Sequence, residues 1–329
     1  MTTLLEAPPQ PPRFDPDVPI ELSRADTGAD RAFRILLAAS STVVLAILVA
    51  VVAFLAVDGW QALQKAGTKF FIGVTWAPEL GRFGMLPLLG GSVAIALVAL
   101  IIALPVSLAT ALMINEYLPP RLRPFLTGVV DLLATVPSIV YGFWGLELIS
   151  GLQAAPAKWL VAHFSFVPFF RTPQPGGYVD SIFAVGLVCA VTIIPIITSV
   201  SRDVMSQAPR DVCEAAMGLG GTRWGMITDV ILPFSRSGIV SAALLGLGRG
   251  LGETMIVVLM LSTANKWTTA IMGPQGLGSI AKQITEYFPT SSSIGRSALV
   301  LLGLVLFVST LVVNAISRMI VNRAGRQRS

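Results

Sequence analysis

Residues 86–114 read LPLLGGSVAIALVALIIALPVSLATALMI and contain no charged side chain. A helix of about 20 residues crosses a hydrocarbon core of about 30 Å, so this stretch is long enough to span a membrane. Similar apolar runs occur at residues 35–57, 125–149, 182–200, 238–261 and 298–320. Because lipid cannot satisfy free backbone groups, runs of this length predict helices. The sequence therefore predicts an all-α integral membrane protein with six transmembrane helices.

The composition agrees with a membrane protein and excludes an ordinary soluble domain. The 329 residues are 54% hydrophobic and 12% charged, with a mean hydropathy of +0.76. Soluble domains carry about twice that charged fraction. The net charge is +5, but the basic residues are spread through the loops. Membrane lipid is therefore the expected surrounding, and no nucleic-acid partner is predicted.

Basic residues also predict which ends face the cytosol. With the N-terminus on side one, that side holds Arg13, Arg24, Arg31, Arg34, Arg121, Arg123, Arg202, Arg210, Arg223, Arg236, Arg318, Arg323, Arg326 and Arg328. Side two holds Lys65, Lys69, Arg82, Lys158, Arg171, Lys266, Lys282 and Arg296. Cytoplasmic loops carry the excess of Lys and Arg, so both termini are expected to face the cytosol.

The apolar runs divide the chain into five parts. They are a tail (1–34), a first helix (35–57), an outer loop (58–84), a core of five helices (85–321) and a C-terminal cytoplasmic tail (322–329). The N-terminal tail is polar and proline-rich, which predicts a disordered cytoplasmic segment rather than a signal peptide.

Two long loops interrupt the core. Residues 201–237 form a cytoplasmic loop, and residues 151–180 form an outer loop. The apolar stretch Trp159–Phe170 in the outer loop is too short to cross, so it either lies along the interface or re-enters the membrane. The single histidine and the two cysteines are too scattered to predict a metal site or a disulfide, and no cofactor is predicted.

The loop 201–237 has the layout of a docking helix. Pro209 suits a first helical turn, while Asp211 and Glu214 complement the positive N-terminal end. A small apolar face is formed at helical spacing by Val212, Ala215, Ala216 and Leu219. Helices that rest on lipid headgroups carry bulky side chains opposite Lys and Arg, whereas this one is small and acidic. Docking of a partner protein is therefore favoured over a lipid-surface helix.

Breakers and caps bound this helix. Gly218 and Gly220 are expected to end it. Thr222 can cap a second short helix that reaches Asp229, and Pro233 is expected to end that second helix before the membrane.

Residues 246–253 read GLGRGLGE inside the fifth apolar run. Arg249 and Glu253 are four residues apart, so they are expected to share a helix face and to pair. Each charge costs at least about 2.5–3.5 kcal/mol at the bilayer centre, so both should face the bundle interior or an aqueous path. The pair is either a structural lock or part of a substrate path. The planar guanidinium group of an arginine can donate hydrogen bonds to two oxygens at once, in a fork-like arrangement that matches an oxyanion.

The sequence contains no motif for hydrolysing ATP. It contains no G-x-x-x-x-G-K-[ST] loop and no set of side chains that could form a serine triad. We therefore expect a transport subunit rather than an enzyme, with any energy supplied by another chain.

These motifs resemble those of a known family. Glu214-Ala215-Ala216, Gly220 and the ending Val230-Ile231-Leu232-Pro233 resemble the EAA loop of ABC importer permeases, except that Val230 stands where isoleucine is usual. Residues 132–142 (LLATVPSIVYG), residues 246–253 and Thr254-Met255 resemble the phosphate-specific permease of PstC type. Permeases of the related PstA type usually have Ala-Pro after Gly-Glu-Thr, so Met255-Ile256 favours PstC. The resemblance extends from Ile35 to the C-terminus.

The resemblance implies a type I ABC importer permease fold with a cytoplasmic coupling helix, located in a bacterial plasma (inner) membrane. It also implies a PstA-type second permease, two PstB-type ATPases, a PstS-type extracytoplasmic phosphate-binding protein, and phosphate as the transported ion. By the same resemblance, Arg249 and Glu253 lie on the phosphate path. The ATPase cleft would receive Glu214, Ala215, Ala216 and Gly220, with Pro233 closing the motif.

Three other functions fit the same residues. A permease for sulfate, molybdate or phosphonate would share the mechanism, an ATP-independent anion channel would need no nucleotide, and a membrane scaffold would transport nothing. The scaffold ranks last, because it gains nothing from two buried charges.

Overall fold

The computed structural model describes residues 28–77, 81–151, 154–170, 180–262, 267–273 and 276–326. The chain divides into two units, residues 1–51 and residues 52–329. In the first unit, the described residues form the beginning of helix α1 (Gly28–Ala66). Residues 1–27 of the expected tail lie outside the described residues. Residues 28–34, also assigned to the tail, are helical, with Asp30 in the first turn, where a carboxylate is favourable.

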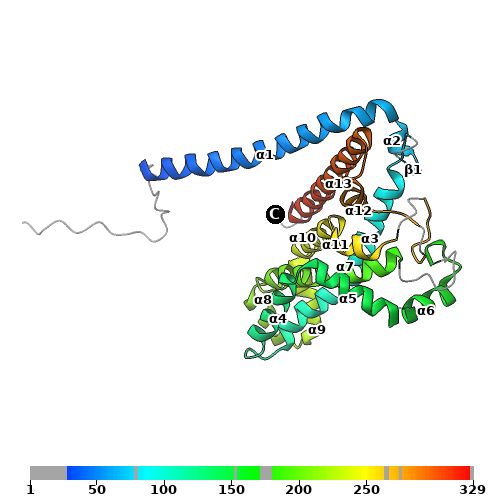
Figure 1. The fold of residues 1–329 in the computed structure, drawn as a ribbon. Helices are drawn as coiled ribbons and strands as arrows, with labels where there is room; N and C mark the ends of the chain where they lie inside the picture. The colour runs from blue at the N-terminus through cyan, green and yellow to red at the C-terminus, as the bar shows by residue number, and fades with distance from the viewer. Residues whose placement is uncertain are drawn as a thin grey trace, which may run out of the picture. The chain divides into compact units, whose positions relative to one another are not determined.

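Five helical stretches of the described chain are long and apolar enough to cross a membrane, and a bent pair of helices makes a sixth (Figure 1). The five are α1, α3 (Leu86–Leu112) with the π-helical turn η2 (Met113–Tyr117), α7 (Ile182–Met205), residues 223–251, and α13 (Ser293–Arg326). The bent pair is α4 (Arg123–Thr135) with α5 (Ser138–Gly151). The six apolar runs of the sequence are therefore present as helices.

Shorter elements connect these spans. They are α2 (Lys69–Ile72), β1 (Trp76–Ala77), β2 (Arg82–Phe83), α6 (Ala154–Phe164), η3 (Pro168–Phe170), α8 (Arg210–Gly218), α9 (Arg223–Met226), η4 (Ile227–Ile231), α10 (Leu232–Leu251), α11 (Met255–Met260) and α12 (Ile280–Tyr287). Strands β1 and β2 form a small antiparallel hairpin in which Trp76 pairs with Phe83.

The third span is not the continuous helix that residues 125–149 predicted. It bends by 89° between α4 and α5. Val136, which precedes Pro137, adopts an extended backbone (φ −63°, ψ 128°). A residue before proline is pushed out of the helical region, and the proline has no N–H to offer the preceding turn. The hydroxyl of Tyr141 donates to the carbonyl of Leu133 (2.9 Å) and thereby joins the two halves.

The fifth span differs from the expected 238–261 at both ends. Its helix already begins at Arg223 and continues through η4 into α10, so Pro233 does not end a helix as the sequence suggested. The π-helical turn, closed by the bond from Leu232 N to Ile227 O, accommodates the proline at the start of α10. The helix stops instead at Leu251, and α11 resumes after Gly252-Glu253-Thr254.

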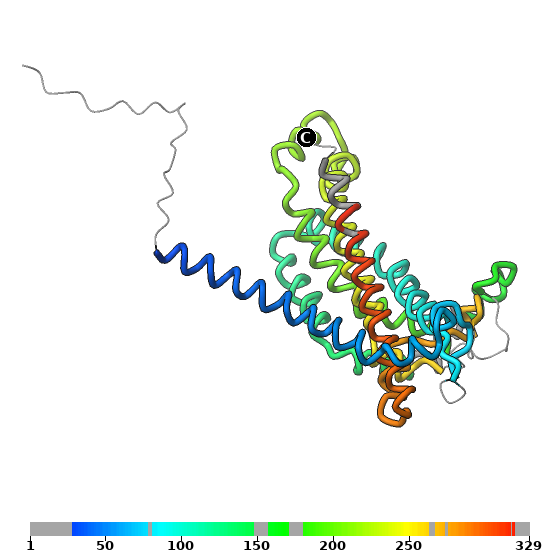
Figure 2. Tube along the Cα trace, turned by 90° about the horizontal axis from the view of Figure 1, so that it is seen from above, coloured from blue at the N-terminus to red at the C-terminus, as the bar shows by residue number. Residues whose placement is uncertain are grey.

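Helices α3, α7 and α10 form the centre of the second unit, and α13 packs against α10 (Figure 2). Small residues allow the closest approaches. A Cβ atom on Gly186 of α7 would lie 2.6 Å from Val98 of α3, and one on Gly246 of α10 would lie 2.6 Å from Ile197. The hydroxyl of Ser107 in α3 also donates to the carbonyl of Ile194 in α7 (3.1 Å). Close small-residue packing with interhelical hydrogen bonds is typical of membrane helices.

A second buried cluster joins the end of α1 to the hairpin. Phe70, Trp76 and Phe83 pack with Ala62 of α1 and with residues of α3, α12 and α13. At the neighbouring end of α3, Ser92 accepts a hydrogen bond from the backbone N–H of Ile280 (3.0 Å) and fixes the start of α12.

The α3–α7 contact gives a test of the core. Gly186→Leu would force its side chain into Val98, so we expect a loss of about 1–3 kcal/mol of stability. Thermal unfolding in detergent would show a lower midpoint. Gly128→Leu is the matched control, because a Cβ atom there meets nothing within 4 Å. Equal midpoints for the two variants would contradict the packing described above.

Candidate functional site

Helix α8 forms the predicted docking segment, and the chain reverses its direction in a tight turn at the C-terminal end of this helix. The N–H of Gly221 donates to the carbonyl of Ala216 (3.1 Å), and the N–H of Gly220 donates to that of Met217 (3.0 Å). This is the Schellman arrangement, which needs a left-handed residue after the helix. Gly220 supplies it with φ +88°. Gly220 therefore contributes the left-handed backbone conformation that ends the helix.

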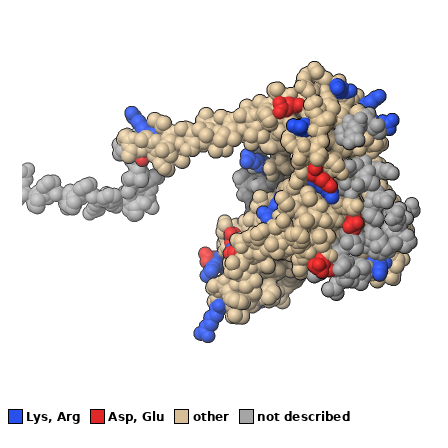
Figure 3. Space-filling view, viewed as in Figure 1, with Lys and Arg blue, Asp and Glu red and all other residues tan. Residues whose placement is uncertain are grey.

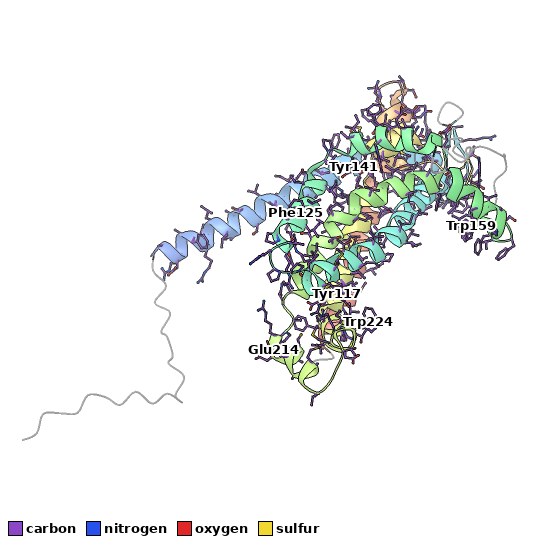
Figure 4. The ribbon with its side chains drawn as sticks, turned by 90° about the horizontal axis from the view of Figure 1, so that it is seen from below. Tyr117, Phe125, Tyr141, Trp159, Glu214 and Trp224 are labelled. Carbon is purple, nitrogen blue, oxygen red and sulfur yellow. The ribbon has the colours of Figure 1, made fainter. Side chains whose placement is uncertain are left out.

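Thr222 caps the next helix, as its position predicted. Its side-chain oxygen accepts from the N–H of Gly225 (3.1 Å), and α9 follows at Arg223. Two short helices thus meet at a sharp corner, at the same end of the bundle as Tyr117 (Figure 4).

One face of α8 is open to solvent. Val212, Ala215 and Leu219 follow helical spacing, and all three are exposed, Leu219 by 91%. Ala216, which the sequence placed on the same face, is half-buried. Glu214 is exposed beside this stripe, and Pro233 is also exposed. Trp224 was not foreseen as part of this surface, but it is 61% exposed just beyond the corner.

The opposite side of the docking segment rests on the bundle. Cys213 packs on a buried cluster that includes Met205, Met226 and Ile231. Arg223 donates to the carbonyl of Glu116 (3.1 Å) and lies 5.5 Å from the ring centre of Tyr117. These contacts tie α8 and α9 to the turn between α3 and α4.

Arg249 lies in the last turn of α10, where it borders a hollow of about 410 Å³. The hollow is lined by Ile196, Leu244, Leu245, Gly248, Arg249, Thr310 and Asn314. The Arg249 side chain is exposed in this chain alone. Thr310 and Asn314 come from α13 and were not singled out by the sequence. The Arg249 guanidinium and the Asn314 amide can both donate hydrogen bonds to an anion, whereas the Thr310 hydroxyl donates to the carbonyl of Phe307 (2.7 Å).

Glu253 lies in the break between α10 and α11 rather than on the helix face of Arg249. It is 8% exposed. No ion pair joins the two side chains in the part of the chain that the structure describes, so the expected pairing is not formed here. The reason is local. The helix ends at Leu251, and the i,i+4 relation holds only while the helix continues.

The segments after the two breaks pack together. A Cβ atom on Gly142 of α5 would lie 2.7 Å from Leu259 of α11, and one on Gly145 would lie 2.8 Å from Met260. Two discontinuous spans therefore support each other next to Glu253. Broken membrane helices are tolerated where they are buried in protein or line a cavity.

Sequence reasoning also missed Lys282. Its side chain is buried, and its amino group donates to the carbonyls of Leu261 (2.5 Å) and Val258 (3.4 Å). Glu286 lies 3.5 Å away. A cation at the end of α11 complements the negative helix terminus. Only the three-dimensional structure shows that Lys282 is buried, because the sequence places it simply in an outer loop.

The outer apolar stretch Trp159–Phe170 forms the end of α6 and the turn η3. The Trp159 ring stacks on His163 at 4.8 Å, and Phe164 lies near Phe166 and Phe170. Trp159 is exposed, at the end of the bundle opposite to Glu214 (Figure 4).

A family model described as "binding-protein-dependent transport system inner membrane component" matches residues 103–326. Among curated proteins, the chain is 35% identical over 304 residues to the phosphate transport system permease protein PstC of Xylella fastidiosa, covering 92% of this chain and 93% of that protein. It is 36% identical over 317 residues to PstC 2 of Mycobacterium bovis, covering 92% and 94%.

The fold is similar to those of solved transporters. A chain in the crystal structure of a bacterial alginate ABC transporter in complex with an alginate pentasaccharide-bound periplasmic protein aligns with TM-score 0.57 and 17% identity. The alignment covers 90% of this chain and 98% of that chain. A chain from another structure of a bacterial ABC transporter for alginate import aligns with TM-score 0.52 and 17% identity, covering 88% and 99%.

The Cys213 thiol reports on the docking segment. Burial raises its pKa above the ordinary value, and the carboxylates of Glu116 and Glu214 raise it further. A raised pKa leaves less thiolate at a given pH, so alkylation should be slow at neutral pH and accelerate only under alkaline conditions.

Alkylation rates measured across pH check this prediction. Glu116→Gln and Glu214→Gln should each move the inflection to lower pH, while Cys189 is buried and contributes little background. An inflection below the ordinary range, or one that neither variant shifts, would contradict this account.

Proposed function

This chain belongs to the family of binding-protein-dependent transport system inner membrane components, and we propose that it is the permease subunit of an ATP-driven importer of inorganic phosphate. It is a multi-pass membrane protein and a transport subunit rather than an enzyme. The observation that carries the substrate is the similarity to phosphate permeases over about nine tenths of the chain.

The proposed assembly contains four kinds of protein. A second, PstA-type permease would complete the translocation pathway, and two PstB-type ATPases would bind from the cytosol. A PstS-type protein would deliver phosphate from outside. The excess of Lys and Arg on one side supports an orientation with both termini in the cytosol, which puts α8 and α9 on the ATPase side.

The docking surface consists of Val212, Glu214 and Ala215 on α8 and of Leu219 directly after it, with Trp224 beside them. Small side chains let a partner's groove approach the helix closely, and the exposed carboxylate offers it a directed charge. Alternating access would follow when ATP-driven closure of the partner dimer moves α8 and α9.

The phosphate path would pass Arg249. Its planar guanidinium can donate two parallel hydrogen bonds to one oxyanion, and the Asn314 amide offers a neutral donor in the same hollow. Glu253 lies close by in the chain but is not paired with Arg249, so it leaves the fork free for substrate. A buried carboxylate near the path would also keep an anion from binding too tightly to leave.

The substrate and the energy source are tested together by reconstitution. The chain is incorporated into vesicles with its partner subunits, and uptake of radiolabelled phosphate is followed with and without ATP. Uptake that needs ATP and resists sulfate, molybdate and phosphonate supports the proposal. Efficient competition by one of those anions would identify another oxyanion permease, and uptake without ATPase subunits would identify a channel.

Arg249→Lys should reduce phosphate uptake about 10- to 100-fold, because an ammonium cannot reproduce the two parallel hydrogen bonds of the fork. The charge is kept, so assembly with the partners should be unchanged. Arg121→Lys is the matched control, since Arg121 is exposed in the turn between α3 and α4, away from the hollow. Wild-type uptake by Arg249→Lys would argue against fork recognition.

Glu214→Ala should weaken ATPase coupling by removing the directed charge from the docking surface. We expect the ratio of phosphate transported to ATP hydrolysed to fall at least about tenfold, as for a charged hydrogen bond worth about 1.5–3 kcal/mol. Asp229→Ala removes an equally exposed acid from the same loop, but outside α8, and should leave the ratio unchanged. Full coupling in Glu214→Ala would refute the docking role.

A further inference from the structure

A basic hollow lies at the opposite end of the second unit from the docking surface. It has a volume of about 570 Å³ and is lined by the last turn of α1, by α2, by residues 73–75 and by β2 with the glycines on either side of it. Lys65, Lys69 and Arg82 border it together. Figure 3 shows basic side chains gathered over α2 and β1 at this end of the chain.

The three cations come from three separate elements, and buried neighbours hold each element in place. Lys65 lies in the last turn of α1, Lys69 opens α2, and Arg82 opens β2. Phe70 and Phe83, which follow Lys69 and Arg82 directly, are buried in the cluster with Ala62 and Trp76. The position of the cations is therefore set by the packed core beneath them, even though their side chains are exposed.

The backbone beneath the hollow is also closely built. Gly73 and Gly84 approach so closely that a Cβ atom on Gly84 would lie 2.5 Å from the carbonyl of Gly73. Met85 N donates to Phe70 O (2.9 Å), and Gly84 N donates to Thr75 O (3.0 Å). These contacts fasten α2 to the hairpin and fix the distance between the basic residues on each.

Among the described residues, the charge of the hollow is not balanced by an acidic partner. None of the three cations forms an ion pair with an acidic residue in the described ranges. Like charges around one space repel each other unless an anion enters. In the proposed orientation they also lie on the outer side, where lysine and arginine are normally depleted. A cluster of three basic residues on the outer side departs from this distribution and therefore points to a specific role.

The surroundings indicate the membrane surface. Ile72 and Val74 line the hollow and are exposed, and Phe71, which directly precedes Ile72, is exposed as well. Trp60 is exposed one to two turns before Lys65 on α1. Exposed aromatic and aliphatic side chains next to cations are typical of the headgroup level of a bilayer.

We propose that Lys65, Lys69 and Arg82 form a second anion site that binds a phosphate group at the outer membrane surface. The group is carried either by inorganic phosphate or by the headgroup of an anionic phospholipid. Both present the same tetrahedral oxyanion, and ammonium and guanidinium groups bind it through charge-assisted hydrogen bonds. The site is separate from the hollow at Arg249, with which it shares no lining residue.

The test uses the transporter purified with its partners in nanodiscs. In one arm the discs contain phosphatidylcholine alone, and binding of radiolabelled inorganic phosphate is measured. In the other arm phosphatidylglycerol is added, and the lipid retained on the protein is counted by native mass spectrometry. The variant Lys65→Gln/Lys69→Gln/Arg82→Gln is compared with wild type, and the single variants are measured alongside.

Each lost cation should weaken binding about fivefold, and the triple variant about 100-fold. Loss in the lipid arm assigns the site to a headgroup, and loss in the phosphate arm assigns it to the free anion. Unchanged binding in both arms overturns the proposal. Lys158→Gln, an exposed lysine of α6 outside the hollow, is the matched control.

Two further measurements keep the result interpretable. The exposed single variants need no repacking, so they report on the site even if the triple variant assembles poorly. Arg249→Lys should retain binding at this outer site although it loses uptake. A failure of the outer site is therefore distinguishable from a failure of the transport proposal.

Discussion

The constraint on which the structure depends is that a helix interrupted inside a membrane must be supported by its neighbours. Two spans are interrupted, at Val136-Pro137 and at Gly252-Thr254. Free backbone groups cannot face lipid, so each break has to lie against protein or water. Close packing of α5 on α11 through Gly142 and Gly145 supports the segments that follow the two breaks. Glu253, inside the second break, is buried.

The interruption also separates two charges that a continuous helix would have paired. An ion pair between Arg249 and Glu253 would stabilise the bundle. It would, however, leave no guanidinium group free to bind a transported anion. Because α10 ends at Leu251, Arg249 faces a hollow shared with α13, while Glu253 is buried behind it. On the proposed function this hollow belongs to the anion path, and water in that path would reduce the cost of about 2.5–3.5 kcal/mol for a charge at the bilayer centre.

The sequence predicted what depends on local composition. Apolar runs gave the six spans, and the cap at Thr222 and the left-handed turn at Gly220 were evident from the residue types. Helix continuity was not predictable. Pro105 and Pro195 lie inside helices, and Pro233 lies inside the continuous stretch 223–251, directly after its π-helical turn, whereas Pro137 marks a break. The local chemistry of proline is the same at all four positions, so the outcome is decided by tertiary neighbours. Asn314 and Lys282 were missed for the same reason, since each acquires its setting from another helix.

The error over Pro233 has a mechanical consequence. A helix that ended there would have left the docking surface hinged to the membrane by a flexible joint. Instead, 29 residues run unbroken from Arg223 to Leu251, a length of roughly 40 Å. One rigid element therefore connects the corner beside α8 with the turn that carries Arg249. On the proposed function, a displacement of α8 and α9 by the ATPase is carried directly to the anion path, because the π-helical turn keeps the proline inside the helix rather than at its end.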